Sequence, residues 1–143
     1  MRISEVIRRK GAAVVTIRPD ATVADLLAQL DEHHIGALVV SEDGGRSVSG
    51  IVTERDVVRE LHHRGPAVLQ VQVAEVMTVE VQTCLPEDHL EDLARRMTDL
   101  RIRHLPVVVD GELKAIVSIG DIVKNRIDEL QAERDHLVDY VRR

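Results

Sequence analysis

The hydrophobic positions along the chain form two similar series. When the sequence is shifted by 67 positions, residues 17–40 align with residues 84–107, and six of the 24 positions are identical. Chance would give roughly two identities at ordinary residue frequencies. A shift of 65 positions then aligns GIVTERDVV at residues 50–58 with AIVSIGDIV at residues 115–123. These matches predict two tandem units of about 60 to 65 residues.

Each unit shows the same order of predicted elements. A short apolar run, residues 14–17 or 79–83, precedes an amphipathic helix whose apolar residues recur at helical spacing. Two apolar strands follow, joined by loops at residues 42–45 and 110–111, and a second helix closes the unit. The pattern predicts a mixed fold of helices and strands, α/β or α+β in class.

The closing helix of the second unit is predicted to be much longer than its counterpart. It covers residues 120–142, whereas the helix of the first unit covers residues 55–63. A stripe of apolar residues lies near one face, with only Arg134 interrupting it: Val123, Ile127, Leu130, Leu137 and Val141. We expect part of this stripe to contact a partner subunit, which predicts a homodimer.

In both units a predicted strand ends at a hydroxyl residue, and an aspartate follows three residues later. The two motifs are Thr53-x-x-Asp56 and Ser118-x-x-Asp121. One interpretation is a capping box, which satisfies free backbone N–H groups at a helix start. The other is a nucleotide site, in which the helix N-terminus binds phosphate and the carboxylate accepts ribose hydroxyls. The two interpretations are compatible, since the hydroxyl residue can cap while the aspartate faces a ligand.

The residues next to these junctions differ between the units. Arg103 and His104 enter a strand of the second unit, where they could hold a phosphate or remain solvated charges. The first unit has Gly36 and Ala37 here, which would let a ligand approach the backbone closely. Arg55 could supply the missing charge. The sequence therefore predicts two chemically unequal sites.

Composition and charge exclude several functions. One aromatic residue, Tyr140, cannot build a stacking platform for single-stranded nucleic acid. A net charge of -6 also argues against binding a phosphate backbone, so we expect no nucleic-acid partner. No stretch approaches the ~20 apolar residues of a membrane span, which predicts no membrane association. The single Cys84 cannot form an internal disulfide and favours a reducing, cytoplasmic location.

Metal and catalytic sites find little support. His33-His34 and His62-His63 are adjacent pairs, and neighbouring residues on a helix do not face each other. Cys84 aligns with an apolar residue of the first unit, so a core position is expected. His89 is expected to start a helix, and residues 8–10 to form a solvated basic end. We therefore predict a non-enzymatic protein with no metal and no required cofactor.

The motifs GIVTERDVVRE, RIRHLPVV and IVSIGDIVK together resemble a tandem CBS-domain pair, or Bateman module. The resemblance covers residues 6–126 and is closest to small stand-alone bacterial CBS-domain proteins. It implies two β-α-β-β-α units packed about a pseudo-twofold axis, followed by a long C-terminal helix. The implied boundaries are 7–66 and 76–132 for the two CBS domains and 133–143 for a helical extension.

The resemblance also implies adenosine-containing ligands, such as AMP, ATP or NAD, in clefts between the units. Asp56 and Asp121 match the ribose-binding aspartates, and Thr53 and Ser118 the phosphate-side hydroxyls. The ligand-binding residues implied in this way are Ile17, Gly36, Ala37, Thr53, Arg55, Asp56, Val79, Arg103, His104, Pro106, Ser118 and Asp121. One departure is Ala115, which replaces the usual glycine before the last strand and is expected to tighten a turn there.

These features predict a regulatory module in which a bound nucleotide changes the arrangement of units or subunits and an unidentified partner protein responds. Such a change requires different ligand affinities for the two arrangements. The alternative is a structural scaffold that dimerises, carries vestigial clefts and binds no ligand. A nucleotide-hydrolysing enzyme is a third hypothesis, for which the sequence offers no general base or nucleophile.

Overall fold

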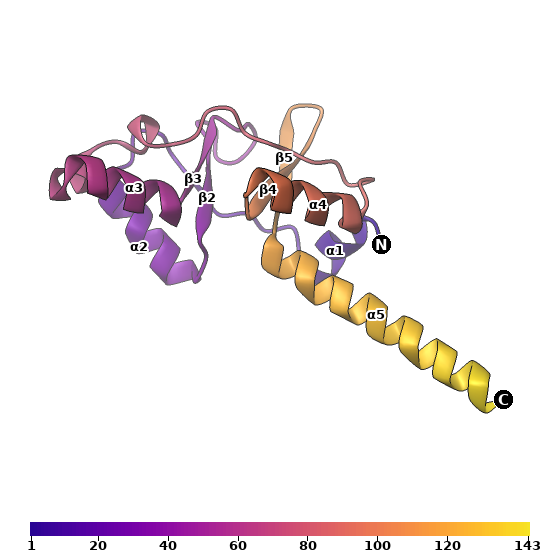
Figure 1. The fold of residues 1–143 in the computed structure, drawn as a ribbon. Coiled ribbons are helices and arrows are strands. Elements are labelled where there is room, and N and C mark those ends of the chain that lie inside the picture. Colours follow the sequence, from indigo (N-terminus) through magenta and orange to yellow (C-terminus); the bar gives the residue numbers. More distant parts are fainter. The chain divides into compact units, whose positions relative to one another are not determined.

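The computed structural model describes residues 1–143 as a mixture of helices and short strands (Figure 1), which confirms the predicted class. In chain order the elements are α1 (Ile3–Lys10), β1 (Thr16–Ile17), α2 (Val23–His33), β2 (Ala37–Val40), β3 (Gly50–Thr53), α3 (Glu54–Arg64), the short 3₁₀ helices η1 (Pro66–Gln70) and η2 (Val73–Glu75), α4 (Leu90–Leu100), β4 (His104–Val109), β5 (Glu112–Ser118) and α5 (Ile119–Arg142).

The chain groups into two compact units. The first-repeat unit contains residues 13–83 and 108–114, and the second-repeat unit contains residues 1–12, 84–107 and 115–143. Helix α1 therefore belongs with the second repeat, although the first repeat follows it directly in sequence. The domain boundaries expected from the resemblance stay predictions.

The first-repeat unit is built on a three-stranded sheet in the order β1-β2-β3. Strand β2 runs parallel to β1 and antiparallel to β3, with Ala37 opposite Thr53 and Val40 opposite Gly50. All four residues of β2 are buried, which explains its unbroken apolar sequence. Helices α2 and α3 add apolar side chains to the same core, which is aliphatic throughout.

Local polar contacts define the ends of these elements. Thr22 and Asp25 form a capping box at the start of α2, as its sequence pattern predicts. In the loop between β2 and β3, Asp43 accepts hydrogen bonds from the Ser41 hydroxyl and from the backbone N–H groups of Arg46 and Ser47. The bonds from Ser47 and Ser41 lower the pKa of Asp43 to about 2, so this loop is held by a charged carboxylate.

The second-repeat unit contains α4 and most of the β4–β5 hairpin. Helix α4 begins after His89, as expected. Asp110 and Gly111 form the turn of the hairpin. Both residues have positive φ, which a two-residue hairpin turn of type I′ requires. The expectation for Ala115 is wrong, because this residue is buried inside β5 and the turn lies several residues earlier.

The apolar runs before α2 and α4 form less strand than expected. The resemblance implies a first strand in each unit. Within the apolar run at residues 14–17 only β1 forms, and the run at residues 79–83 contains no strand. Val79 is 67% exposed, so the segment lacks the buried face that stabilises a strand. Its successor Cys84 forms an isolated parallel bridge with Val107.

Helix α5 is the longest element and has two different halves. Its first half contacts α1 and α4 and buries Ile122 and Asn125, whereas residues 131–143 are exposed throughout. Neither α5 nor any other helix is sufficiently long and apolar to cross a bilayer.

Gly50 offers a direct test of the packing in the first-repeat unit. A Cβ atom at this position would lie 2.7 Å from Met77 Sδ and 2.8 Å from the Thr78 backbone oxygen. That oxygen cannot move freely, because it accepts a hydrogen bond from Ile51 N–H at 3.0 Å. We expect Gly50→Ala to lower the free energy of unfolding by about 1–3 kcal/mol, measured by urea denaturation.

The matched control is Gly120→Ala, whose added Cβ would meet only Ser118 Oγ at 3.6 Å. Gly120 lies in a helix, where alanine is the better helix former, so stability should be unchanged or slightly raised. Equal effects of the two substitutions would contradict the close packing of Gly50 against residue 78.

Candidate functional site

The start of α3 carries the first candidate carboxylate. Asp56 is buried, with 6% of its surface exposed, and its Oδ2 accepts hydrogen bonds from Thr53 N–H at 2.9 Å and Thr53 Oγ1 at 3.2 Å. The Asp56 N–H in turn donates to Thr53 Oγ1, which completes a capping box. Asp56 Oδ1 lies 2.6 Å from Arg59 Nη2 in the next turn. Arg59 is a site residue that the sequence reasoning missed.

The small residues expected at this site lie directly beside the helix start. Ala37 is the strand partner of Thr53, and the Gly36 carbonyl accepts a hydrogen bond from Glu54 N–H at 3.0 Å. Arg55 is exposed in the first helical turn. The structure therefore brings Gly36, Ala37, Thr53, Arg55 and Asp56 together around one helix N-terminus.

Two predicted residues of the same unit lie elsewhere. Ile17 pairs with Val40, at the opposite end of β2 from Ala37 and about 10 Å along the strand. Its side chain is buried in the core. Val79 follows Thr78, which pairs with Ile51 near that same far end. The structure does not bring Ile17 or Val79 to the start of α3.

The start of α5 repeats the arrangement in the second-repeat unit. Asp121 Oδ2 accepts hydrogen bonds from Ser118 N–H at 2.9 Å and Ser118 Oγ at 3.0 Å. The Arg103 carbonyl accepts from Ile119 N–H at 2.8 Å, in the place that the Gly36 carbonyl takes in the first repeat. Arg103, which is exposed, and the part-buried His104 thus lie beside this helix start.

Pro106 does not share that position. It is buried inside β4, two residues further along the strand than His104, and its carbonyl accepts a hydrogen bond from Cys84 N–H at 2.9 Å. The backbone of Pro106 therefore hydrogen-bonds residue 84 to β4, and the residue itself is buried.

A residue that the sequence reasoning missed contacts the second candidate carboxylate. Lys10, at the end of α1, places its Nζ 2.5 Å from Asp121 Oδ2. Arg9 donates from Nη1 to Asn125 Oδ1 at 3.2 Å. Both residues are exposed, as the prediction of a solvated basic end requires, but each also has a partner on α5 that the prediction did not include. No local signal could have revealed the contact, because it depends on α1 packing against α5 more than a hundred positions away.

The two carboxylates differ in what they can still bind. Asp56 uses both oxygens, and its side chain is 8% exposed. The hydrogen bonds of Asp121 all end on Oδ2, and its side chain is 21% exposed. An ionised carboxylate offers about four acceptor positions. Asp121 therefore has the larger free acceptor capacity, on Oδ1, and is the more accessible of the two.

The charge state of Asp121 depends on Lys10. Burial by itself raises the pKa of Asp121, but the hydrogen bond from Lys10, the bonds from Ser118 and the positive charge of Lys10 together hold it below its ordinary value. The group is therefore ionised at neutral pH and acts as an acceptor. This is the protonation state that hydrogen bonds to a ribose would require.

Cys84 lies in the core, as its alignment predicts, with 3% of its surface exposed. Burial raises the pKa of its thiol to about 12, so the nucleophilic thiolate is scarce at neutral pH. Across residues 1–143 no three His, Cys, Asp or Glu side chains gather as metal ligands.

Comparisons with known proteins identify the family of the chain. The CBS domain family matches the chain twice, at residues 3–63 and 73–128. The CBS domain-containing protein CBSX3 of Arabidopsis thaliana, a mitochondrial protein, is 35% identical over 97% of this chain and 71% of its own length. The chain belongs to the CBS-domain family and carries two tandem CBS repeats.

Solved structures share the fold. The CBS-domain containing protein ATU1752 from Agrobacterium tumefaciens has a TM-score of 0.85 and 40% identity, covering 88% of this chain and 99% of that one. The CBS domain protein PAE2072 from Pyrobaculum aerophilum, solved in complex with AMP, has a TM-score of 0.72 and 27% identity over 85% of this chain and 89% of its own.

Removing Lys10 tests the electrostatics of Asp121. The folded-state pKa of Asp121 lies below its unfolded value, so the ion pair stabilises the fold at neutral pH and is lost as pH falls through the folded pKa. We expect Lys10→Gln to lower the free energy of unfolding by about 1 kcal/mol near pH 7 and by progressively less toward pH 3.

The control for this measurement is Lys124→Gln, which removes an equal charge from an exposed position of α5. Urea denaturation across the pH range should show little effect of Lys124→Gln at any pH. If Lys10→Gln lowers the free energy of unfolding by the same amount at every pH down to pH 3, that loss does not come from the charge of Asp121.

The thiol of Cys84 offers an independent test of burial. With a pKa of about 12, it should react with iodoacetamide at neutral pH far more slowly in the native protein than in urea-unfolded protein. Mass spectrometry of timed samples measures the two rates. Comparable rates would show that residue 84 is accessible and that its expected core position is wrong.

Proposed function

We propose that the chain is a regulatory module that binds an adenosine nucleotide of the AMP, ATP or NAD class and is not an enzyme. The observation that carries this proposal is the repetition of one polar junction at the starts of α3 and α5. At both, a hydroxyl residue caps the helix and a negatively charged aspartate is held against the preceding strand.

The chemistry of the junctions suits a nucleotide. The positive end of a helix attracts phosphate oxygens, although two N–H groups in each first turn already donate within the chain. An oriented carboxylate can accept hydrogen bonds from the two ribose hydroxyls. Arg103 and His104 on the strand beside α5 add cationic or donor groups. The strand beside α3 has Gly36 and Ala37 there, and the cations belong to α3 itself, as Arg55 and Arg59. Together with the greater accessibility of Asp121, this favours the α5 junction as the stronger site.

The choice of AMP as the first ligand to test rests on a relative. PAE2072, at 27% identity, was solved in complex with AMP. Adenine itself would meet Ile, Val and Leu side chains here, because the core is aliphatic. An aliphatic adenine pocket does not discriminate between ligands that differ only in the groups attached beyond the ribose. ATP and NAD therefore belong in the same test.

Lys10 provides a physical route from ligand to conformation. A ribose that bonds to Oδ1 of Asp121 would draw on the negative charge that also holds the Lys10 ammonium at Oδ2, and so weaken the contact between α1 and α5. The ligand then shifts the protein toward whichever arrangement binds it better. We propose that an unidentified partner protein responds to this change, in a reducing compartment such as the cytoplasm that suits the lone thiol of Cys84.

A structural scaffold is the alternative function, and one observation favours it. The carboxylate of Asp56 already has hydrogen-bond partners on both oxygens within the chain. A capping box with this geometry stabilises a helix whether or not a ligand binds. Under this alternative, substitutions at Asp56 and Asp121 would change stability alone.

Nucleotide-dependent stability separates the two functions. We expect AMP, ATP or NAD at a hundredfold excess over its dissociation constant to raise the free energy of unfolding by about 2.7 kcal/mol. Asp121→Asn should abolish most of this response, because the neutral amide keeps the side-chain shape but loses one acceptor and the charge. Thermal denaturation with each nucleotide, followed by calorimetry, measures the effect.

The chain contains a matched control for this experiment. Asp25 forms the same capping box at the start of α2, with Thr22 N–H donating to Asp25 Oδ2 at 3.1 Å. Asp25→Asn should cost the stability of one capping box, without the Lys10 ion pair that Asp121→Asn also weakens, and leave the nucleotide response intact. Equal losses of response in both variants, or no response in the unmodified protein, would favour the scaffold. Chromatography of the recovered nucleotide tests the non-enzymatic part, since hydrolysis products would contradict it.

A further inference from the structure

The end of helix α1 brings positive charge to the start of α5. Lys10 is the last residue of α1, and Gly11, with a φ of 95°, ends the helix directly after it. Lys10 Nζ lies 2.5 Å from Asp121 Oδ2, and Arg9 donates from Nη1 to Asn125 Oδ1 at 3.2 Å. Asn125 in turn donates from Nδ2 to the backbone carbonyl of Asp121 at 2.7 Å. Two cations of α1 are thus held against the first two turns of α5.

The packing of α1 keeps Lys10 in this place. Ile3 and Val6 of α1 are completely buried, and the Ile3 N–H donates to the Asp88 carbonyl at 2.9 Å. Neither the apolar packing nor the backbone hydrogen bond involves the ammonium of Lys10. The helix therefore keeps this ammonium within reach of α5 without relying on the ion pair.

The start of α5 carries more positive charge than the start of α3. Beside the single carboxylate of Asp121 lie two cations, Lys10 from α1 and Arg103 from the end of the adjoining strand β4. At the start of α3 two acidic and two basic side chains balance each other: Glu54, Asp56, Arg55 and Arg59. An anionic ligand is therefore favoured at the start of α5.

The two units differ in charge in the same direction. The first-repeat unit contains 6 basic and 13 acidic residues, a formal charge of -7. The second-repeat unit contains 13 basic and 12 acidic residues, a formal charge of +1. The summed charge of a domain adds to the field of the groups that line a site. The unit that contains Lys10 and Asp121 thus repels an anion less than the other unit does.

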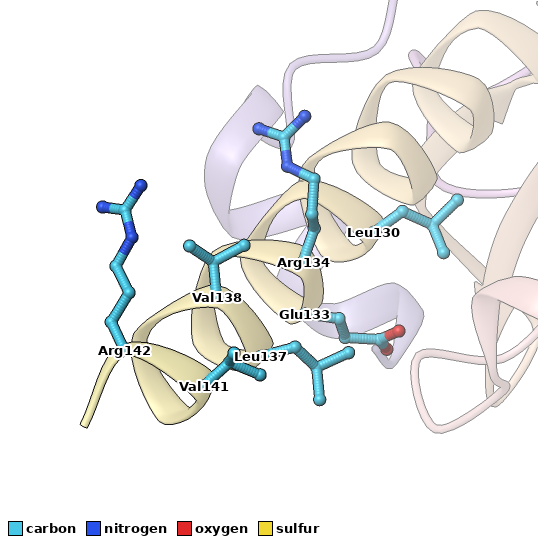
Figure 2. A pocket seen from close by; sticks show the side chains of 7 residues that line it. All are labelled: Leu130, Glu133, Arg134, Leu137, Val138, Val141 and Arg142. Carbon is cyan, nitrogen blue, oxygen red and sulfur yellow. The ribbon is translucent and has the colours of Figure 1, made fainter.

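The arginines at the far end of α5 do not produce this difference. Figure 2 shows Arg134 and Arg142 on the C-terminal half of the helix, beyond Leu130. Residues 131–143 contain three acidic and three basic residues, so their charges cancel. The distance from Asp121 to Arg134 along the helix is about 20 Å, which exceeds the screening length of about 8–10 Å at physiological salt. The charge at the start of α5 is therefore set locally.

We propose that Lys10 makes the site at the start of α5 selective for adenosine ligands that carry a 5′-phosphate, because its ammonium neutralises Asp121 toward the phosphate. This inference rests on the proposed function and names the chemical group that the site selects. A carboxylate that accepts hydrogen bonds from ribose hydroxyls also repels a phosphate joined to the same ribose through a single CH₂ group. An ammonium on Oδ2 offsets this repulsion and leaves Oδ1 to the ribose.

Comparing AMP with adenosine tests the selectivity, since the two ligands differ only in the phosphate. In titration calorimetry of the full chain at low ionic strength, we expect AMP to bind about tenfold or more tightly than adenosine. Lys10→Gln should weaken AMP binding about tenfold and change adenosine binding less than about twofold, because only the phosphate meets the uncompensated carboxylate. Lys10→Arg keeps the charge and should keep the preference for AMP. Where two binding events occur, the one removed by Asp121→Asn is compared.

Arg8→Gln is the matched control, because it removes the same charge from the last turn of α1. Arg8 lies two positions before Lys10, and residues at that spacing do not face each other on a helix. Both affinities should stay unchanged in this variant. Added salt should narrow the gap between AMP and adenosine in the unmodified chain. Thermal denaturation checks that each variant is folded at the temperature of the titration.

The outcomes separate this inference from the proposed function. Equal losses of AMP and adenosine affinity in Lys10→Gln would show that Lys10 only supports the structure around Asp121. That result, or equal affinities for the two ligands in the unmodified chain, would overturn the selectivity and leave nucleotide binding intact. If AMP, adenosine, ATP and NAD all fail to bind the unmodified chain, the proposed function is wrong, and the inference is wrong with it.

Discussion

The hydrogen bond from a strand-end backbone N–H to the carboxylate of an aspartate three residues later organises both repeats. Thr53 and Ser118 donate this bond to Asp56 and Asp121, and the next helical N–H reaches back to the carbonyl of residue 36 or 103. One small network thus joins two strands to a helix start. It leaves a negative charge at the positive end of the helix, an arrangement that is stable without a ligand and chemically suited to one.

The two junctions have diverged through their cationic partners. Asp56 is paired by Arg59 from its own helix, whereas Asp121 is paired by Lys10 from α1. A pair within one helix is local and needs no other element to move. A pair between two helices couples the carboxylate to the position of α1, which contributes Ile3 and Val6 to the buried residues. The second junction is therefore the one where a change at the carboxylate has a structural consequence beyond its own helix.

Helix α5 has two halves with different surroundings. Its first turns carry the capping box, contact α1 and α4 and bury Ile122 and Asn125. Further along, Leu137 is 66% exposed and Val141 is 82% exposed. The same helix thus begins at the candidate site and ends in an exposed segment that the core of its unit does not use.

The order of elements, the capping boxes and the mixed fold were predictable because each depends on residues close in sequence. Thr22, Thr53 and Ser118 each reach an aspartate three residues on, and the turn at Asp110 and Gly111 needs only residues that tolerate positive φ. The apolar run at residues 79–83 forms no strand, because such a run forms a strand only where a partner and a buried face exist.

What only the tertiary structure decided is which distant groups meet. The sequence could not place α1 with the second repeat, and so could not pair Lys10 with Asp121 or Arg9 with Asn125. The strand register also decides that Ile17, a ligand-binding residue implied by the resemblance, lies at the far end of β2 from Ala37. Local hydrogen bonds are encoded within one turn of the chain, but contacts between helices and strand registers are set by how the whole apolar surface is buried.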